Sequence, residues 1–246
     1  AAAQDNTAMS SAIAPAIYAA AGVSGVNSTN VNLINSLLDT AAIQGSSVNT
    51  VSEIQALVDA ASRLEALANG LPDAVTPLSA DDIAALGLAD TISSTPALQL
   101  FNEVVDRAPA SVLAGENPAG AVNRLADIVD RVMQTAADLA VSPALTADEL
   151  QALGLNEVSS GLLGDYIQAI AATANDGSAV DTFSELQDLV KAVNWANALP
   201  AMSIEEAGSG ISAAELANGI QTAVSLPAHA QVGDTITFTV THTADG

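Results

Sequence analysis

The sequence has no cysteine, few aromatic residues and few basic residues, and each shortage excludes a class of protein. Without cysteine there can be no disulfide framework, no thiolate catalysis and no cysteine-based zinc site. Aromatic residues make up 2% of the chain and hydrophobic residues 50%, so any core must consist of Ala, Leu, Ile and Val. Lys and Arg number 5 against 28 Asp and Glu, which gives a formal net charge of −23. Because this charge repels phosphate backbones and anionic lipids, we expect no binding to nucleic acid or to membrane surfaces.

Long apolar runs and catalytic motifs are also missing. No window approaches the roughly 18 uninterrupted apolar residues of a membrane-spanning helix, so no membrane insertion is predicted. The chain contains no G-x-S-x-G, P-loop or H-E-x-x-H motif. His229 and His242 have no carboxylate or serine at motif spacing, and we expect them to be surface residues. The sequence therefore predicts that the protein is not an enzyme. The first residues, AAAQDNTAMS, do not form a signal peptide, which favours a fragment of a longer chain over a mature protein.

One helical pattern occurs twice, at residues 50–60 (TVSEIQALVDA) and at residues 182–192 (TFSELQDLVKA). Each copy opens with the T-x-x-E spacing of a capping box, in Thr50 with Glu53 and in Thr182 with Glu185. Apolar residues then recur at steps of three and four, as expected for one stripe of a helix: Val51, Ile54, Leu57, Val58, Ala61 and Leu64, and Phe183, Leu186, Leu189, Val190 and Val193. A stripe this narrow must be covered by partner helices.

Two shorter helices precede each such helix, and the order repeats. Pro15 is suited to open a first helix and Gly22 to end it. The same start returns as LSADDIAALGL at 78–88 and as LTADELQALGL at 145–155. In the first round, Asn27 or Ser28 is expected to cap the second helix. The remaining inward positions are predicted to be Val31, Ile34, Leu37, Leu38, Leu98, Phe101, Val104, Val105, Val122, Leu125, Ile128, Val129, Val132, Leu163, Tyr166, Ile167 and Ile170.

The predicted fold is mainly α, with tandem small three-helix-bundle units and a short C-terminal β segment. The units are expected at residues 1–74, 75–141 and 142–200, followed by a partial helical unit at 201–225 and a β-strand segment at 226–246. Because three stripes can cover one another, we expect each unit to have its own core and only small contacts with the next unit.

The C-terminal segment alternates between apolar residues and threonine, which is typical of a half-buried β-strand. Ile236, Phe238 and Val240 share one face, and they are the predicted interaction residues. A lone strand leaves its backbone amides and carbonyls without partners. We therefore expect these three side chains to pack against a second molecule, or to be partly exposed if the rest of a β domain is missing.

Two further features of the sequence are candidates for binding sites. Asn175, Asp176 and Asp181 could offer oxygen ligands to calcium, but the D-x-D-x-D-G order is missing and an Asp-Gly turn followed by a helix cap is favoured. No cofactor is therefore predicted, and calcium alone is left open. Trp195 is expected to pack in a core or between units, because carbohydrate platforms usually show several aromatic residues.

These motifs together resemble a known family. The A-G-V and L-G-L stops, the DGSAVDT turn at 176–182 and the T-x-S-E-[IL]-Q-x-L-V helix are similar to the tandem helical repeats of giant bacterial surface and biofilm adhesins, including RTX-type adhesins. In that family such repeats stand beside immunoglobulin-like modules, whose GDT-rich opening strand resembles residues 232–235 (VGDT). The resemblance covers about residues 14–225 and 226–246. A weaker similarity to the three-helix GA module lies at residues 22–24 and 32–35.

The resemblance implies a non-enzymatic structural or spacer region of a secreted, surface-associated bacterial adhesin, whose partner is another protein or a neighbouring module. Two alternatives remain open. The chain could be a subunit of an extracellular filament assembled by β-strand donation, or a module that binds a host or matrix protein through a helical face.

Overall fold

The computed structural model describes residues 11–71, 76–198, 201–204 and 222–226, and the single residues 233, 235 and 237. The chain divides into two compact units, Ala1–Val193 and Asn194–Gly246. The described residues are mainly helical, which confirms the predicted fold class. None of the helices in the described ranges has both the length and the apolarity that a membrane span requires.

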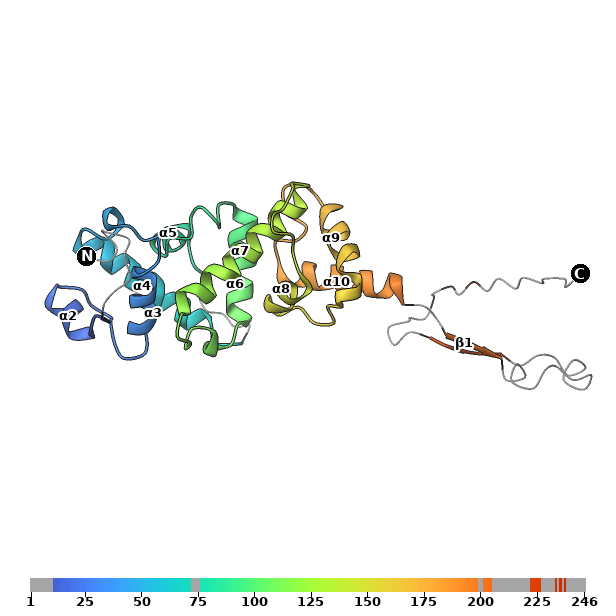
Figure 1. The fold of residues 1–246 in the computed structure, drawn as a ribbon, viewed down its shortest axis with the longest axis horizontal. Coiled ribbons are helices and arrows are strands. Elements are labelled where there is room, and N and C mark those ends of the chain that lie inside the picture. Colours follow the sequence, from blue (N-terminus) through green and yellow to red (C-terminus); the bar gives the residue numbers. More distant parts are fainter. Residues whose placement is uncertain are drawn as a thin grey trace, which may run out of the picture. The chain divides into compact units, whose positions relative to one another are not determined.

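Within the described ranges 11–71 and 76–198, the α-helices follow one another in three rounds of three (Figure 1). The first round consists of α2 (Pro15–Ala20), α3 (Val31–Leu38) and α4 (Val51–Leu67). The second consists of α5 (Ala80–Ala85), α6 (Thr95–Arg107) and α7 (Pro118–Ala136). The third consists of α8 (Ala147–Ala152), α9 (Leu163–Ala171) and α10 (Phe183–Asn197). Short 3-10 turns lie within the connections at η1 (Gly45–Ser47), η2 (Ala110–Val112) and η3 (Ser160–Leu162).

The predicted capping boxes are present. At the start of α4, the Glu53 amide donates to the Thr50 hydroxyl (3.2 Å) and the Thr50 amide donates to the Glu53 carboxylate (2.9 Å). Equivalent boxes open three other helices, at Ser79 with Asp82, Thr146 with Glu149 and Thr182 with Glu185. Each box pairs amides of the first helical turn that would otherwise have no partner. These helix starts are thus fixed by local sequence.

The predicted cap of α3 is wrong. Neither Asn27 nor Ser28 precedes the helix directly, because α3 begins at Val31 and Asn30 is the residue before it. The side-chain Oδ1 of Asn27 instead accepts from the backbone amides of Thr29 (2.8 Å) and Asn30 (3.3 Å). Asn27 therefore organises the turn ahead of the helix, a common alternative use of an Asn side chain.

Each first helix ends at a glycine with positive φ. The φ angle is +87° at Gly22, +75° at Gly87 and +90° at Gly154. An added Cβ would lie 3.9 Å from Val51 at Gly22, and 3.5 Å from Phe183 at Gly154. Gly22 and Gly154 therefore let the chain reverse directly beside the start of the third helix, whereas Gly87 lies against Ala42 and Ile43 of the first round.

The core lies beneath the predicted stripes. In α4 the residues Leu57, Val58, Ala61 and Leu64 are buried, and the stripe predicted in α7 is buried throughout. Of the other residues predicted in the α4 stripe, Ile54 is half-buried and Val51 is 49% exposed. Val51 lies in the first turn of α4 beside Gly22, which has no side chain to cover it.

The three rounds share one continuous hydrophobic core, which corrects the prediction of separately packed units with small contacts. The first helices α5 and α8 have six residues each, too few to cover a round alone. They pack instead on the third helix of the preceding round, α5 on α4 and α8 on α7. Helix α7 also contacts α3 and α9, so it connects all three rounds.

The second unit contains a short antiparallel pair of strands, β1 (Ala201–Ile204) and β2 (Thr222–Ser225). Ala201 lies opposite Ser225, and Ile204 lies opposite Thr222. The partial helical unit predicted at 201–225 is therefore wrong at both ends. The backbone groups of the two segments pair with each other in an antiparallel ladder instead of within a helix.

The remaining predictions for the C-terminal region fall largely on residues that are not described. Residues 205–221 lie outside the described residues, and so do Ile236, Phe238, Val240, His229 and His242. Thr235 and Thr237 are described; both are exposed, and neither belongs to a strand.

Candidate functional site

An arginine joins the first round to the second. Arg63 of α4 donates from Nε to the Asp82 Oδ1 of α5 (3.1 Å), and its Nη2 contacts the same oxygen. The other carboxylate oxygen of Asp82 accepts from the Ser79 amide (2.9 Å) and hydroxyl (2.8 Å). Burial raises the pKa of the Asp82 carboxyl, but the hydrogen bonds from Arg63 and Ser79 outweigh it, so the pKa lies below its usual value. One buried carboxylate thus caps its own helix and binds the preceding round.

The second and third rounds are joined in the same way. Arg131 of α7 makes a bidentate pair with Glu149 of α8, with Nη1–Oε2 at 3.0 Å and Nη2–Oε1 at 2.6 Å. The two side chains are only 12% and 18% exposed. The Thr146 amide donates to the same carboxylate (2.9 Å). The hydrogen bond from Arg131 is the largest cause of the lowered pKa of Glu149, which falls to about 2.

These two pairs were missed from the sequence, although a signal exists. The arginines stand 19 and 18 residues before the carboxylates they bind, and each carboxylate is the acidic member of a capping box. In a chain with only 5 Lys and Arg, these nearly equal spacings could have identified the two junctions.

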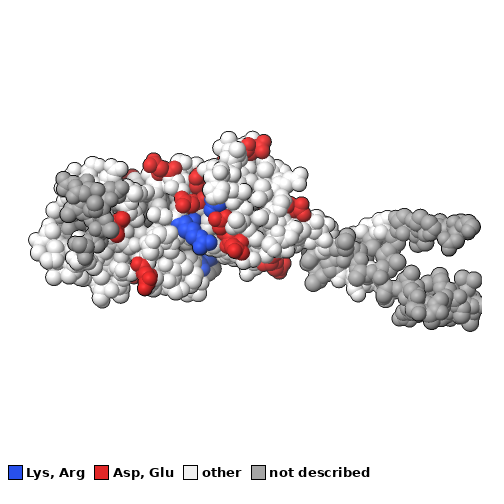
Figure 2. Space-filling model, viewed as in Figure 1, with Lys and Arg blue, Asp and Glu red and all other residues white. Residues whose placement is uncertain are grey.

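A third arginine connects two rounds by stacking on an aromatic ring, between α6 and α10. The Arg107 guanidinium lies over the Phe183 ring, 4.3 Å from its centroid, and the Phe183 amide donates to Glu103 (2.9 Å). Arg107 also pairs with Glu103 at 3.5 Å. With the exposed pair Lys191–Asp188, four of the five basic residues form ion pairs. Figure 2 shows basic side chains gathered in one small area of the visible face, while acidic side chains are dispersed.

Within the first and third rounds, a glutamine binds the loop that follows the first helix. Gln55 accepts from the Ser24 amide (2.8 Å) and donates to the Ser24 carbonyl (3.1 Å). Gln187 makes the same two bonds with Asn156, at 2.8 and 3.1 Å. Both pairs keep the offset of 132 residues (187 − 55, 156 − 24) that also relates Thr50 to Thr182. Residues at this offset therefore make equivalent contacts in the two rounds.

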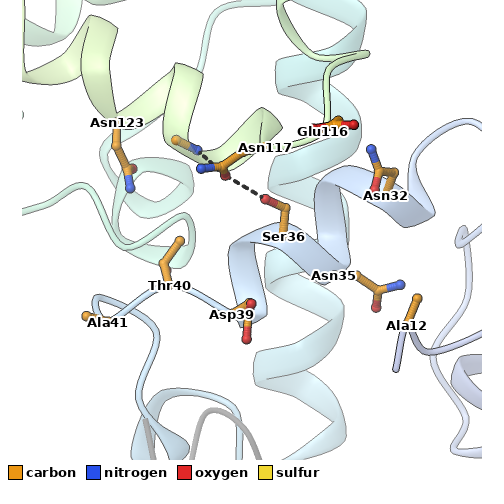
Figure 3. Close-up of a pocket in the computed structure, with 11 residues that line it drawn as sticks. Ala12, Asn32, Asn35, Ser36, Asp39, Thr40, Ala41, Glu116, Asn117 and Asn123 are labelled. Atoms are coloured by element: carbon orange, nitrogen blue, oxygen red, sulfur yellow. Dashed lines mark hydrogen bonds between the residues drawn. The ribbon is translucent and has the colours of Figure 1, made fainter. Parts of the chain in front are cut away.

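A polar groove of about 510 Å3 lies between α3 and the start of α7 (Figure 3). The Ser36 hydroxyl donates to Asn117 Oδ1 (3.2 Å) and accepts from the Ala119 amide (3.2 Å). Asn32 donates to the Gly115 carbonyl (3.2 Å). These lining groups attach α3 to the start of α7.

Asn35, another lining residue, is buried and holds the first round together. It accepts from the Tyr18 hydroxyl (2.7 Å) and donates to the Ile13 carbonyl (3.0 Å). Burial raises the pKa of Tyr18 to about 12. The ionisable lining residues, Asp39 and Glu116, are both acidic. The groove therefore offers a ligand no cation and no aromatic platform.

The weak calcium candidates do not form a ligand set. Asp176 accepts from the Ser178 amide (3.0 Å) and hydroxyl (2.7 Å), bonds that lower its pKa and close the predicted turn. Asn175 is exposed. Burial, followed by the interaction with Glu185, raises the pKa of Asp181. Among residues whose placement is described, no group of three or more His, Asp or Glu is arranged to hold a metal ion.

Trp195 differs from the prediction that it packs in a core or between units. It lies near the end of α10 and is 48% exposed. The last inward residue of the stripe is Val193, which is buried.

Comparison with known proteins identifies no similar family, protein or structure. No protein-family model matches the chain. Searches of curated proteins and of solved structures likewise find no match.

Proposed function

We propose that the helical rounds form a non-enzymatic spacer in a secreted, surface-associated bacterial adhesin, where they hold neighbouring parts of a long chain apart. The observation that carries this proposal is the use of the scarce basic residues. Arg63 and Arg131 each fasten one round to the next, and Arg107 packs on the first residue of α10. In a chain with a net charge of −23, these cations would be the natural anchors for an anionic ligand.

The buried polar groups support the same role. Asn35, Asp82 and Gln187 all bind other parts of the helical unit, so their polar groups serve packing between elements. A spacer must transmit position along its length, and interlocked helical rounds with one core resist bending at the boundaries between them.

The proposal is tested by replacing residues 11–198 in the bacterium that carries the chain. One strain would lack the segment, and a second would carry an unrelated helical domain of the same length with no known ligand. We expect the deletion to reduce adhesion and the replacement to restore it. A replacement that fails, while the purified chain binds host or matrix protein, would reject the spacer role in favour of a binding module.

A further inference from the structure

The carboxylates of the two internal junctions occupy equivalent positions, and this position and that of Arg63 can be followed to the first and the last described rounds. The carboxylates Asp82 and Glu149 each stand five residues before the glycine that ends their helix, Gly87 and Gly154. Counting back in the same way from Gly22 in α2 leads to Ile17. The first round thus carries an apolar side chain where the later rounds carry the junction carboxylate.

In α10, the position that corresponds to Arg63 of α4 is also occupied by an apolar residue. Arg63 stands 13 residues after the cap residue Thr50 of α4, and Trp195 stands 13 residues after the cap residue Thr182 of α10. The shared glutamine bonds of Gln55 and Gln187 confirm that the two helices are in register. Trp195 is therefore the positional counterpart of a junction arginine.

Both apolar residues are exposed, and Ile17 differs in this from the covered carboxylates Asp82 and Glu149. Ile17 is 62% exposed and Trp195 48%, and they belong to a small set of large apolar residues with such exposure among the described ones. Of the internal junction residues, Asp82, Arg131 and Glu149 are largely covered by the neighbouring round, whereas the Arg63 side chain is 46% exposed even with its partner in place. Exposure of a large apolar side chain to water is unfavourable. Contact between an Ile and a Trp at matching junction positions would bury both side chains and stabilise the association.

We propose that these ends bind each other between copies of the chain, so that α2 of one copy packs on α10 of the next with Ile17 against Trp195. The contact repeats the arrangement in which α5 packs on α4 and α8 packs on α7. Because the two surfaces differ, the association is head-to-tail and can continue into a row of copies. This assembly does not depend on the spacer role.

The charge of the chain opposes association between copies at low salt. Each copy has a net charge of −23, so two copies repel one another over long distances. Salt screens that repulsion and leaves the apolar contact intact. Association should therefore strengthen with salt, in contrast to association through ion pairs.

The test uses sedimentation velocity on the full 246-residue chain across a concentration series. We expect a reversible monomer–oligomer equilibrium that shifts toward oligomer between about 0.05 M and about 0.5 M NaCl. Trp195 is the only tryptophan, so its emission should shift to the blue as oligomers form. A chain that stays monomeric throughout, or oligomers without a change in emission, would overturn the proposal.

Two single variants locate the contact. I17E and W195R should each weaken association roughly tenfold or more, because each puts a charge against an apolar partner. L139E is the matched control, since Leu139 is 59% exposed and occupies neither junction position. Far-UV circular dichroism should be unchanged in all three variants. Equal effects of L139E and I17E would reject the assigned surface.

The double variant I17E/W195R separates a specific junction from general stickiness. It supplies the carboxylate and the arginine that occupy these positions inside the unit, as in Glu149 with Arg131. We expect association to recover relative to either single variant, and now to weaken as salt is raised. Failure of the double variant to recover would show that the two positions do not meet.

Discussion

At the scale of single residues, the protein uses very few side chains to connect its helices. Glu149 accepts from Arg131 of the preceding round and from the amide of its own cap residue, so one carboxylate serves two contacts. Asp82 does the same at the earlier junction. Such groups are costly to bury alone, and their value lies in the complete set of partners.

The first prediction concerns the α4 stripe. Leu57 is buried and Asp59, on the same helix, is exposed, with Gln55 as a hydrogen-bond partner (2.8 Å). Replacing Leu57 by Ala should lower the free energy of unfolding by about 2–5 kcal/mol, whereas Asp59→Ala should change it by no more than about 0.5 kcal/mol. Urea denaturation measures both values, and equal effects would contradict the assignment of the two faces.

The second prediction concerns the Arg131–Glu149 pair. Arg131→Met should lower the free energy of unfolding at pH 7 by about 1.5–3 kcal/mol, because the carboxylate loses a charged bidentate partner. The exposed Lys191–Asp188 pair is the matched control, and Lys191→Met should cost less than about 1 kcal/mol.

The same pair predicts a dependence on pH. The pKa of Glu149 is lowered to about 2 in the folded protein, from an ordinary value of 4.5. The ionised group therefore stabilises the fold above the unfolded-state pKa, and this contribution disappears as pH falls through the folded-state value. The difference in unfolding free energy between wild type and Glu149→Gln should shrink from pH 7 to pH 3. A constant difference would show that Glu149 does not titrate as an ion-paired group.

At the scale of elements, the short first helices depend on what they pack against. Helices α2, α5 and α8 have six residues each, fewer than an isolated helix needs for stability in water. Each is followed by a glycine with positive φ at which the chain turns. Because α5 and α8 are too short to be stable alone, they pack on the third helix of the preceding round. This packing joins each round to the one before it.

The fourth prediction concerns one of these glycines. Gly87 has φ +75°, and an added Cβ would lie 2.9 Å from Ile43 Cδ1 and 3.0 Å from Ala42 Cβ. Gly87→Ala should therefore lower the free energy of unfolding by about 1–3 kcal/mol through backbone strain and crowding. Gly115 has no neighbouring atom within 4 Å, and Gly115→Ala should be neutral within about 0.5 kcal/mol. A neutral Gly87→Ala would show that α5 does not pack closely on the first round.

At the scale of the whole molecule, one core runs through all three rounds of the first unit. The core is aliphatic with very few aromatic residues, so the buried area of each round is small. Contacts between rounds therefore carry a large share of the stabilisation.

The fifth prediction is that the helical part unfolds in one transition. Leu57 of the first round and Leu150 of the third are both fully buried. Leu57→Ala and Leu150→Ala should each shift the whole far-UV circular dichroism transition in urea to lower concentration. Two transitions, with each variant shifting only one of them, would restore the interpretation of independent units.

The sequence by itself determined the features that depend on neighbours within one or two helical turns. The capping box at Thr50, the stop at Gly22 and the buried stripe of α4 follow from residues close along the chain. The mainly helical fold and its three rounds follow from their recurrence. Only the tertiary structure decided which side chains meet across rounds, that residues 201–204 and 222–225 form strands, and that Trp195 is exposed. These contacts, the strand pairing and the exposure of Trp195 depend on residues distant in sequence. A local pattern shows that one face of a helix is apolar, but it does not show which distant element covers that face.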